Sequence, residues 1–130
     1  MKIEHIALWT DDIEAMREFY LSYFDTVCGG KYINPNKHYT SYFISFNDGG
    51  ARIELMHRPD IYEPVSNRGM TKGFAHISIC IGGKEEVNKL TECMRNDGRR
   101  IISEPRTTGD GYYESVIADP EGNYIELLGE

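Results

Sequence analysis

Two histidines and two glutamates stand at matching places in the sequence and have the chemistry of a metal site. His5 and His76 are 71 positions apart (76 minus 5), and Glu54 and Glu126 are 72 apart (126 minus 54). Equal offsets at both ends of a segment indicate one supersecondary unit used twice. Imidazole nitrogen binds zinc, nickel, copper or iron, whereas carboxylate oxygen suits harder ions.

The repeat also predicts where these side chains point. Because side chains alternate across a strand, His76 should lie opposite the aliphatic residues of its segment, and Glu54 and Glu126 should each lie opposite two flanking aliphatic residues. Two carboxylates buried together repel and lose hydration, and a divalent cation removes that cost. Two nitrogen and two oxygen ligands leave positions open for water or substrate on a five- or six-coordinate ion, which is typical of catalytic metal sites.

Each residue alone has a simpler interpretation. His5 alone is a surface residue near the N-terminus, and Glu54 alone is an ion-paired residue of an edge strand. The metal-binding interpretation depends on the repeat, which gives all four residues equivalent positions. His38 and His57 have no counterpart in the repeat and are interpreted as surface histidines.

The elements that must position these residues follow the order strand, helix and three strands in each half. Apolar residues at helical spacing predict the helices, and alternating β-formers predict the strands. Module one covers about 1–57 and module two about 73–130, with a linker at about 58–72 inside one domain of residues 1–130. A glycine-containing loop at 105–111 is a candidate mobile cover for a site. The predicted elements are strand 3–9, helix 12–24 and strands 31–33, 39–46 and 51–56, then strand 74–81, helix 84–97 and strands 100–103, 112–118 and 124–128.

Composition narrows the function classes. The net charge of −7 and the pI of about 5.1 argue against nucleic acids and anionic membranes as partners. No window approaches the roughly 18 apolar residues of a membrane span, and the N-terminus lacks the pattern of a signal peptide, so a cytoplasmic protein is expected. The three cysteines form no C-x-x-C pair and are interpreted as reduced packing residues.

The motifs that carry this repeat resemble those of the vicinal oxygen chelate superfamily, which includes glyoxalases, bleomycin resistance proteins and dioxygenases. They are H-I-A and I-E-L in the first half, and G-F-A-H-I-S and D-P-E-G-N-Y-I-E-L in the second. The resemblance covers nearly the whole chain. It implies an α+β fold of two tandem βαβββ modules that form a cupped mixed sheet with the helices outside. It also implies a divalent metal, nickel or zinc first and cobalt, manganese or iron as further options.

Within that superfamily, His5, Glu54, His76 and Glu126 match the metal ligands of glyoxalase I-like enzymes. The resemblance implies a lyase or isomerase that acts on a hemithioacetal or a related small α-hydroxycarbonyl through an enediolate. Glu54 and Glu126 are both candidates for the proton transfer, and the choice between them stays open. Methylmalonyl-CoA epimerases are similar but carry glutamine at the position of Glu54, and bleomycin-binding members lack the metal; both are alternatives.

Two positions depart from bacterial glyoxalase I. Trp9 stands where those enzymes place an arginine for glutathione, and Arg58 stands where they often place an asparagine. Another thiol adduct is therefore an open alternative to glutathione. Trp9, Arg106 and Tyr113 are candidate substrate contacts. The resemblance further suggests a homodimer, and it leaves open whether the site lies within one chain or between two.

Overall fold

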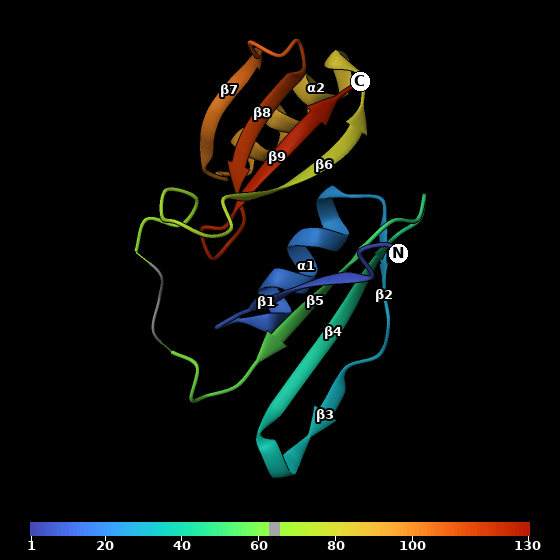
Figure 1. Cartoon of the computed structure of the whole chain (residues 1–130), viewed down its shortest axis with the longest axis vertical. Coiled ribbons are helices and arrows are strands. Elements are labelled where there is room, and N and C mark those ends of the chain that lie inside the picture. The colour runs from blue at the N-terminus through green and yellow to red at the C-terminus, as the bar shows by residue number, and fades with distance from the viewer. Residues whose placement is uncertain (63–65) are drawn as a thin grey trace. The chain divides into compact units, whose positions relative to one another are not determined.

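The structure is a computed structural model that describes residues 1–62 and 66–130. The chain divides into two compact units, Met1–Pro64 and Val65–Glu130. Each unit is built around one mixed β-sheet and one α-helix, and the elements of each are labelled in Figure 1.

The first unit has a sheet in which the first and the fifth strand lie side by side. Its sheet runs in the order β1-β5-β4-β2, and β3 also pairs with β4. The pairing of β1 with β5 is parallel, and the other pairings are antiparallel. The elements are β1 (His5–Trp9), α1 (Ile13–Tyr23), β2 (Thr26–Cys28), β3 (Tyr32–Asn34), β4 (Tyr39–Phe46) and β5 (Arg52–His57), with a 3₁₀ turn at Pro35–Lys37.

The second unit repeats this arrangement. Its sheet runs in the order β6-β9-β8-β7, and β6 is parallel to β9. The elements are β6 (His76–Gly82), α2 (Lys84–Asn96), β7 (Ile101–Thr107), β8 (Tyr113–Ala118) and β9 (Tyr124–Gly129). The predicted α+β fold with two βαβββ modules in tandem is therefore confirmed.

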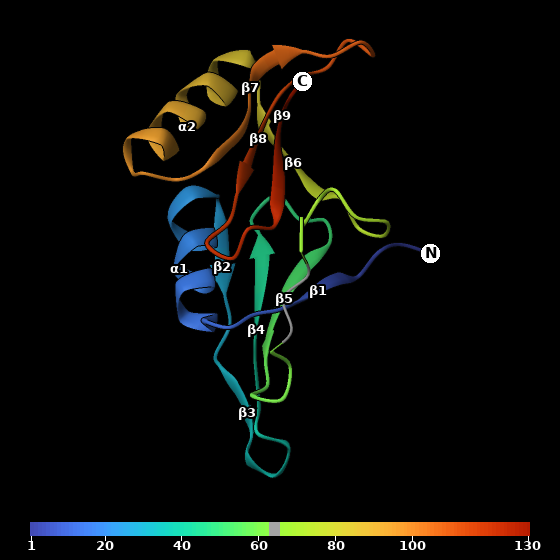
Figure 2. The ribbon, with the colours of Figure 1, turned by 90° about the vertical axis from the view of Figure 1, so that its left-hand side faces the viewer.

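Each helix covers one face of its own sheet, as the turned view in Figure 2 shows. Helix α1 begins after Asp12, whose carboxylate accepts a hydrogen bond from the Ala15 amide, as an N-cap does. Its apolar stripe packs against the inward side chains of β4 and β5, and α2 does the same over β8 and β9. The buried core residues include Met16, Phe19, Tyr20, Ile44, Ile53 and Leu55 in the first unit, and Val87, Met94, Ile117, Ile125 and Leu127 in the second.

The end of the predicted linker packs on the second unit. The Arg68 guanidinium donates a hydrogen bond to the Asn123 side chain over 2.5 Å. The backbone of Gly69 lies so close to the Tyr124 ring that an added Cβ would stand 2.3 Å from it. Asn123 is itself held by Asp119, whose carboxylate accepts hydrogen bonds from the Asn123 amide and side chain. Arg68 and Gly69 of the predicted linker thus belong to the second unit.

Two strands of the structure differ from the prediction. Strand β2 was not predicted, because three residues between a helix and Gly29 are too few to show alternation. Strand β7 extends to Thr107, so Pro105 lies within a strand and the predicted loop at 105–111 begins only after residue 107. Proline is tolerated there because β7 is an edge strand with a register shift between Ser103 and Arg106.

Three side chains lie in surroundings that differ from those predicted. Cys80 and Cys93 are exposed and not packed, because Cys80 lies on the helix-free side of its sheet and Cys93 lies on the outer side of α2. His57 is half-buried, and its Nδ1 lies 2.9 Å from the Thr10 carbonyl oxygen. His38 is exposed, as predicted. Neither helix in the described part of the chain is long and apolar enough to cross a membrane.

Candidate metal-binding pairs

In the first unit, His5 and Glu54 lie together on the sheet face that α1 does not cover. Strands β1 and β5 are parallel, with Ala7 opposite Glu54, so His5, Ala7 and Glu54 share one face. The His5 Nε2 atom lies 3.6 Å from Glu54 Oε2. The Glu54 side chain is only 14% exposed, which agrees with the prediction that a carboxylate between Ile53 and Leu55 is not freely solvated.

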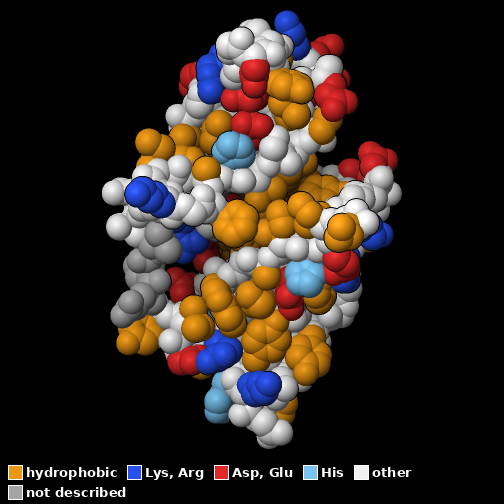
Figure 3. Space-filling model, viewed as in Figure 1, with side chains coloured by type: hydrophobic (Ala, Val, Ile, Leu, Met, Phe, Trp, Pro, Cys, Tyr) orange, Lys and Arg blue, Asp and Glu red, His pale blue; other side chains and the backbone are white. Residues whose placement is uncertain are grey.

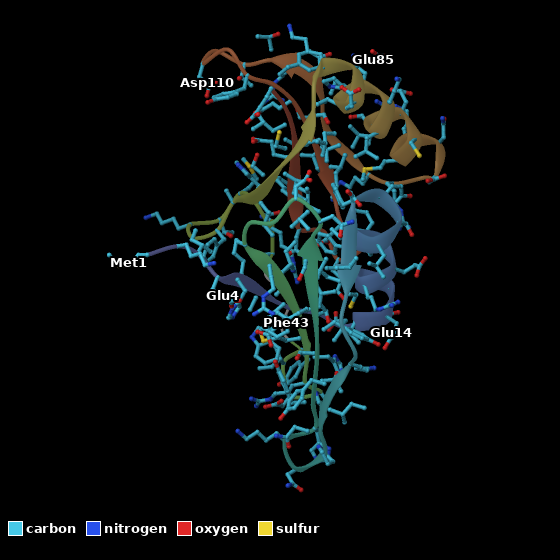
Figure 4. All side chains as sticks on the ribbon, turned by 90° about the vertical axis from the view of Figure 1, so that its right-hand side faces the viewer. Met1, Glu4, Glu14, Phe43, Glu85 and Asp110 are labelled. Carbon is cyan, nitrogen blue, oxygen red and sulfur yellow. The ribbon has the colours of Figure 1, made fainter. Side chains whose placement is uncertain are left out.

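Two aromatic residues of β4 surround this pair. The Tyr39 hydroxyl donates to Glu54 Oε1 over 2.8 Å. Burial, together with the hydrogen bond to Glu54, raises the pKa of the Tyr39 phenol, so it keeps its proton and acts as the donor. The Phe43 ring stands edge-on to the His5 ring at 5.5 Å. In Figure 4, Phe43 lies on the opposite side of the sheet from Glu14 of α1.

The other nitrogen of His5 faces an acid. Its Nδ1 contacts the Glu4 carboxylate, which also accepts a hydrogen bond from Arg52 Nε over 2.8 Å. These hydrogen bonds from His5 and Arg52 lower the pKa of Glu4, which is labelled in Figure 4. A carboxylate at Nδ1 favours the tautomer with its proton on that atom, which leaves the Nε2 lone pair directed toward Glu54.

In the second unit, His76 and Glu126 repeat this geometry. Strands β6 and β9 are parallel, with Ser78 opposite Glu126, which is the register of Ala7 and Glu54. The His76 Nε2 atom lies 3.5 Å from Glu126 Oε2, and the Glu126 side chain is 14% exposed. The Ser78 hydroxyl donates to Glu126 Oε1 over 2.6 Å. In Figure 3, a histidine lies beside acidic side chains in each unit.

A third glutamate, Glu114, lies close to Glu126 and was not predicted. It is on β8, two residues before Val116, which pairs with Glu126. Burial raises the pKa of the Glu114 carboxyl, and the neighbouring charge of Glu126 raises it further. Arg106 opposes this shift, since its Nη2 lies 3.1 Å from Glu114 Oε1.

The three predicted substrate contacts lie in different surroundings. Trp9 is on the face of His5 and Glu54, and its half-exposed ring stands edge-on to Tyr39 at 6.3 Å. Arg106 is paired with Glu114. The side chain of Tyr113 lies on the opposite face of its sheet from Glu114, and its hydroxyl donates to Asn88 of α2 over 2.8 Å. The structure therefore does not bring Tyr113 to Glu126.

The chemistry and spacing of each pair suit a divalent cation. Two ligand atoms about 2.1 Å from one ion stand about 3.4 Å apart at the tetrahedral angle. The separations of 3.6 and 3.5 Å are near that value and are too long for a hydrogen bond. Within neither unit do the described residues gather three or more His, Cys, Asp or Glu side chains around one point. One unit thus offers two ligands, and a full coordination sphere needs more than one pair.

Comparison with known proteins gives the chain its family. The profile of the Glyoxalase/Bleomycin resistance protein/Dioxygenase superfamily matches residues 2–127. No curated protein sequence matches the chain.

Several solved structures share the fold. Glyoxalase I from Zea mays superposes with a TM-score of 0.82 at 23% identity, over 99% of this chain and 44% of the maize chain. The trypanothione-dependent glyoxalase I of Leishmania major gives a TM-score of 0.79 at 23% identity, over 100% of this chain and 87% of that one. A possible glyoxalase from Bacillus cereus gives a TM-score of 0.71 at 26% identity, over 98% of both chains.

The chain therefore spans less than half of the maize enzyme, although its fold is that of the glyoxalase I structures. Nearly every residue lies within the match to the family profile. This protein belongs to the glyoxalase/bleomycin resistance protein/dioxygenase superfamily.

Proposed function

We propose that this protein is a divalent-metal enzyme of the glyoxalase I type. Its reaction would be the isomerisation of a hemithioacetal, or of a related small α-hydroxycarbonyl compound, through an enediolate. The observation that supports this most is the His–Glu pair that recurs in the same strand register in both units. Glu54 distinguishes this donor set from that of the epimerase-like members, which carry glutamine there.

The proposed ligands are His5, Glu54, His76 and Glu126, with nickel or zinc as the first choice of metal and cobalt, manganese or iron as further options. The donor set of two imidazoles and two carboxylates suits these ions. When bound, such a cation stabilises the negative charge that develops on substrate oxygens. Whether one chain or two supply the complete set is part of the proposal to be tested.

The glutamates are the proposed proton-transfer groups. Glu54 and Glu126 each accept a hydroxyl hydrogen bond on Oε1. A partly buried carboxylate near the reacting carbon can remove a proton from it and return one to the neighbouring carbon. Glu126 differs from Glu54 in having the second carboxyl of Glu114 beside it.

Substrate contacts are proposed for Trp9 and Arg106. The half-exposed Trp9 ring offers an apolar surface on the face of His5 and Glu54. Arg106 is held by Glu114 on the face of Glu126. The position of Tyr113 beside Asn88 argues against a direct contact from this residue.

A cytoplasmic homodimer completes the proposal. Two exposed free cysteines suit a reducing compartment. The dimer is proposed by analogy with other members of the superfamily, in which a two-fold axis relates two chains and generates two equal sites.

The decisive experiment combines elemental analysis with an activity assay. Purified native protein should hold stoichiometric metal, and Glu54→Gln should lower that content, whereas Glu85→Gln on the exposed start of α2 should not. Adducts of methylglyoxal with glutathione and with other thiols should be converted in the presence of nickel, zinc, cobalt or manganese. Protein with no metal would support a small-molecule binding protein, and a failure to convert any adduct would refute the lyase.

A further inference from the structure

Both glutamates of the His–Glu pairs have one oxygen held by a hydroxyl group and the other directed to the histidine. Glu54 Oε1 accepts from Tyr39 over 2.8 Å, while Glu54 Oε2 lies 3.6 Å from His5 Nε2. Glu126 Oε1 accepts from Ser78 over 2.6 Å, while its Oε2 lies 3.5 Å from the His76 Nε2 atom. The same division between the two oxygens thus occurs twice.

The two hydroxyl groups come from places that the repeat does not relate. Ser78 lies directly opposite Glu126 on the parallel neighbour strand. The equivalent position opposite Glu54 is Ala7, which has no hydroxyl. Tyr39 supplies one instead from β4, on the other side of β5. The hydroxyl-to-carboxylate contact is therefore present in both units although the residue that makes it has changed.

The donor groups are held in place before any ion binds. The Tyr39 ring stands edge-on to the Trp9 ring at 6.3 Å and lies 6.0 Å from the Tyr32 ring, which limits where its hydroxyl can go. Ser78 is short and is fixed by the ladder between β6 and β9. A hydrogen bond from a hydroxyl to an ionised carboxylate is among the stronger kinds, and it restrains the rotation of the carboxylate.

We propose that Tyr39 and Ser78 are positioning residues that present Glu54 and Glu126 as one-oxygen ligands. By donating to Oε1, each hydroxyl competes with chelation of the ion through both oxygens and favours Oε2, beside the histidine, as the ligand atom. This inference rests on the proposed metal site. Groups that orient metal ligands typically contribute a factor of about 10–100 to metal affinity.

The test measures Co²⁺ affinity by competition with a chelator for wild type, Tyr39→Phe and Ser78→Ala. Each variant should bind Co²⁺ about 10–100-fold more weakly than wild type. The d–d absorption of bound Co²⁺ should also change, since freeing Oε1 alters the coordination number. Ser78→Thr retains the hydroxyl and should restore most of the affinity.

Matched controls separate positioning from general structural damage. Tyr42→Phe removes a hydroxyl from the same strand as Tyr39, where it contacts Glu14 at 3.2 Å on the helix side. Ser22→Ala removes a serine hydroxyl that donates to Glu18 on α1. Both controls should leave the Co²⁺ affinity unchanged, because neither hydroxyl contacts Glu54 or Glu126. Urea midpoints of the metal-free proteins report any loss of fold.

The outcomes distinguish the two proposals. Wild type that binds Co²⁺, with Tyr39→Phe and Ser78→Ala binding it equally well, would overturn the positioning role alone. Weakening by the control variants to the same extent would also overturn it, because the effect would then not depend on contact with Glu54 or Glu126. Wild type that binds no Co²⁺ would overturn the metal site and the positioning role together.

Discussion

A buried pair of hydroxyls anchors strand β8 to helix α2 and offers a quantitative test of the second unit. Thr91 and Ser115 are both 0% exposed, and their hydroxyl oxygens lie 2.7 Å apart. The Thr91 hydroxyl also lies 2.7 Å from the Val87 carbonyl oxygen. Because a hydroxyl has one proton, Thr91 donates to Val87 and Ser115 donates to Thr91. Ser115 immediately follows Glu114, so this contact helps to fix the strand that carries that carboxyl.

The two single substitutions should have unequal costs. Thr91→Val keeps the shape of the side chain but leaves the buried Ser115 hydroxyl without its acceptor, which should cost about 1–3 kcal/mol. Ser115→Ala removes the donor itself and leaves Thr91 bonded to Val87, so it should cost about 0.5–1.5 kcal/mol. The double variant contains no orphaned hydroxyl. Its cost should therefore be smaller than the sum of the single costs by about 1 kcal/mol.

Urea denaturation of the metal-free proteins, followed by circular dichroism, measures all four free energies of unfolding. The midpoint should shift while the slope against urea stays constant, since the same surface is exposed on unfolding. Equal stability of Thr91→Val and wild type would refute the donor assignment. A larger loss for Ser115→Ala than for Thr91→Val would refute it as well.

Three further predictions test other parts of the chain. Gly69→Ala should lower the free energy of unfolding by more than the roughly 1–2 kcal/mol that a left-handed backbone alone costs, because the added Cβ would meet the Tyr124 ring. Gly49 has a similar φ of 88° and nothing within 4 Å of an added Cβ, so Gly49→Ala measures the backbone cost by itself in the same urea assay. Asp12→Ala should lower the free energy of unfolding by about 1 kcal/mol, because the Ala15 amide loses its N-cap acceptor. Asp12→Asn keeps an acceptor oxygen and should retain most of the wild-type stability. Equal thermal midpoints for Asp12→Ala and wild type would contradict the role of Asp12 as the N-cap. Because the folded-state pKa of Glu114 is raised above 4.5, the contribution of this carboxyl to the stability of the metal-free protein should fall as the pH rises from below that value through the raised pKa. Glu114→Gln has no carboxyl to titrate, so its free energy of unfolding relative to wild type should increase with pH over this range. A difference between the two free energies of unfolding that stayed constant with pH would contradict this prediction.

The sequence predicts most of the elements because alternation and helical spacing are local properties. The faces of His76, Glu54 and Glu126 follow from their flanking aliphatic residues, and the structure places them as predicted. The offset between the two histidines and that between the two glutamates also follow from the repeat. These local patterns therefore suffice for most of the elements and for the sheet face on which His76, Glu54 and Glu126 lie.

Contacts that depend on the register between strands could not be predicted in this way. Glu114 approaches Glu126 only because Val116, two residues after Glu114 on β8, pairs with Glu126 on β9. The contact of Tyr39 with Glu54 likewise depends on how β4 pairs with β5. No spacing within one strand reveals which residue of the next strand stands opposite.

Arg68 and Gly69 contact Asn123 and Tyr124, and these contacts determine where a truncated protein that contains only the second unit should begin. A shortened protein that begins at β6 lacks Arg68 and Gly69. The Asn123 side chain would then lose its hydrogen bond from the Arg68 guanidinium, and one side of the Tyr124 ring would become exposed to solvent. A fragment intended to fold as the C-terminal half must therefore start upstream of Arg68, well before the first strand that a secondary-structure boundary would suggest.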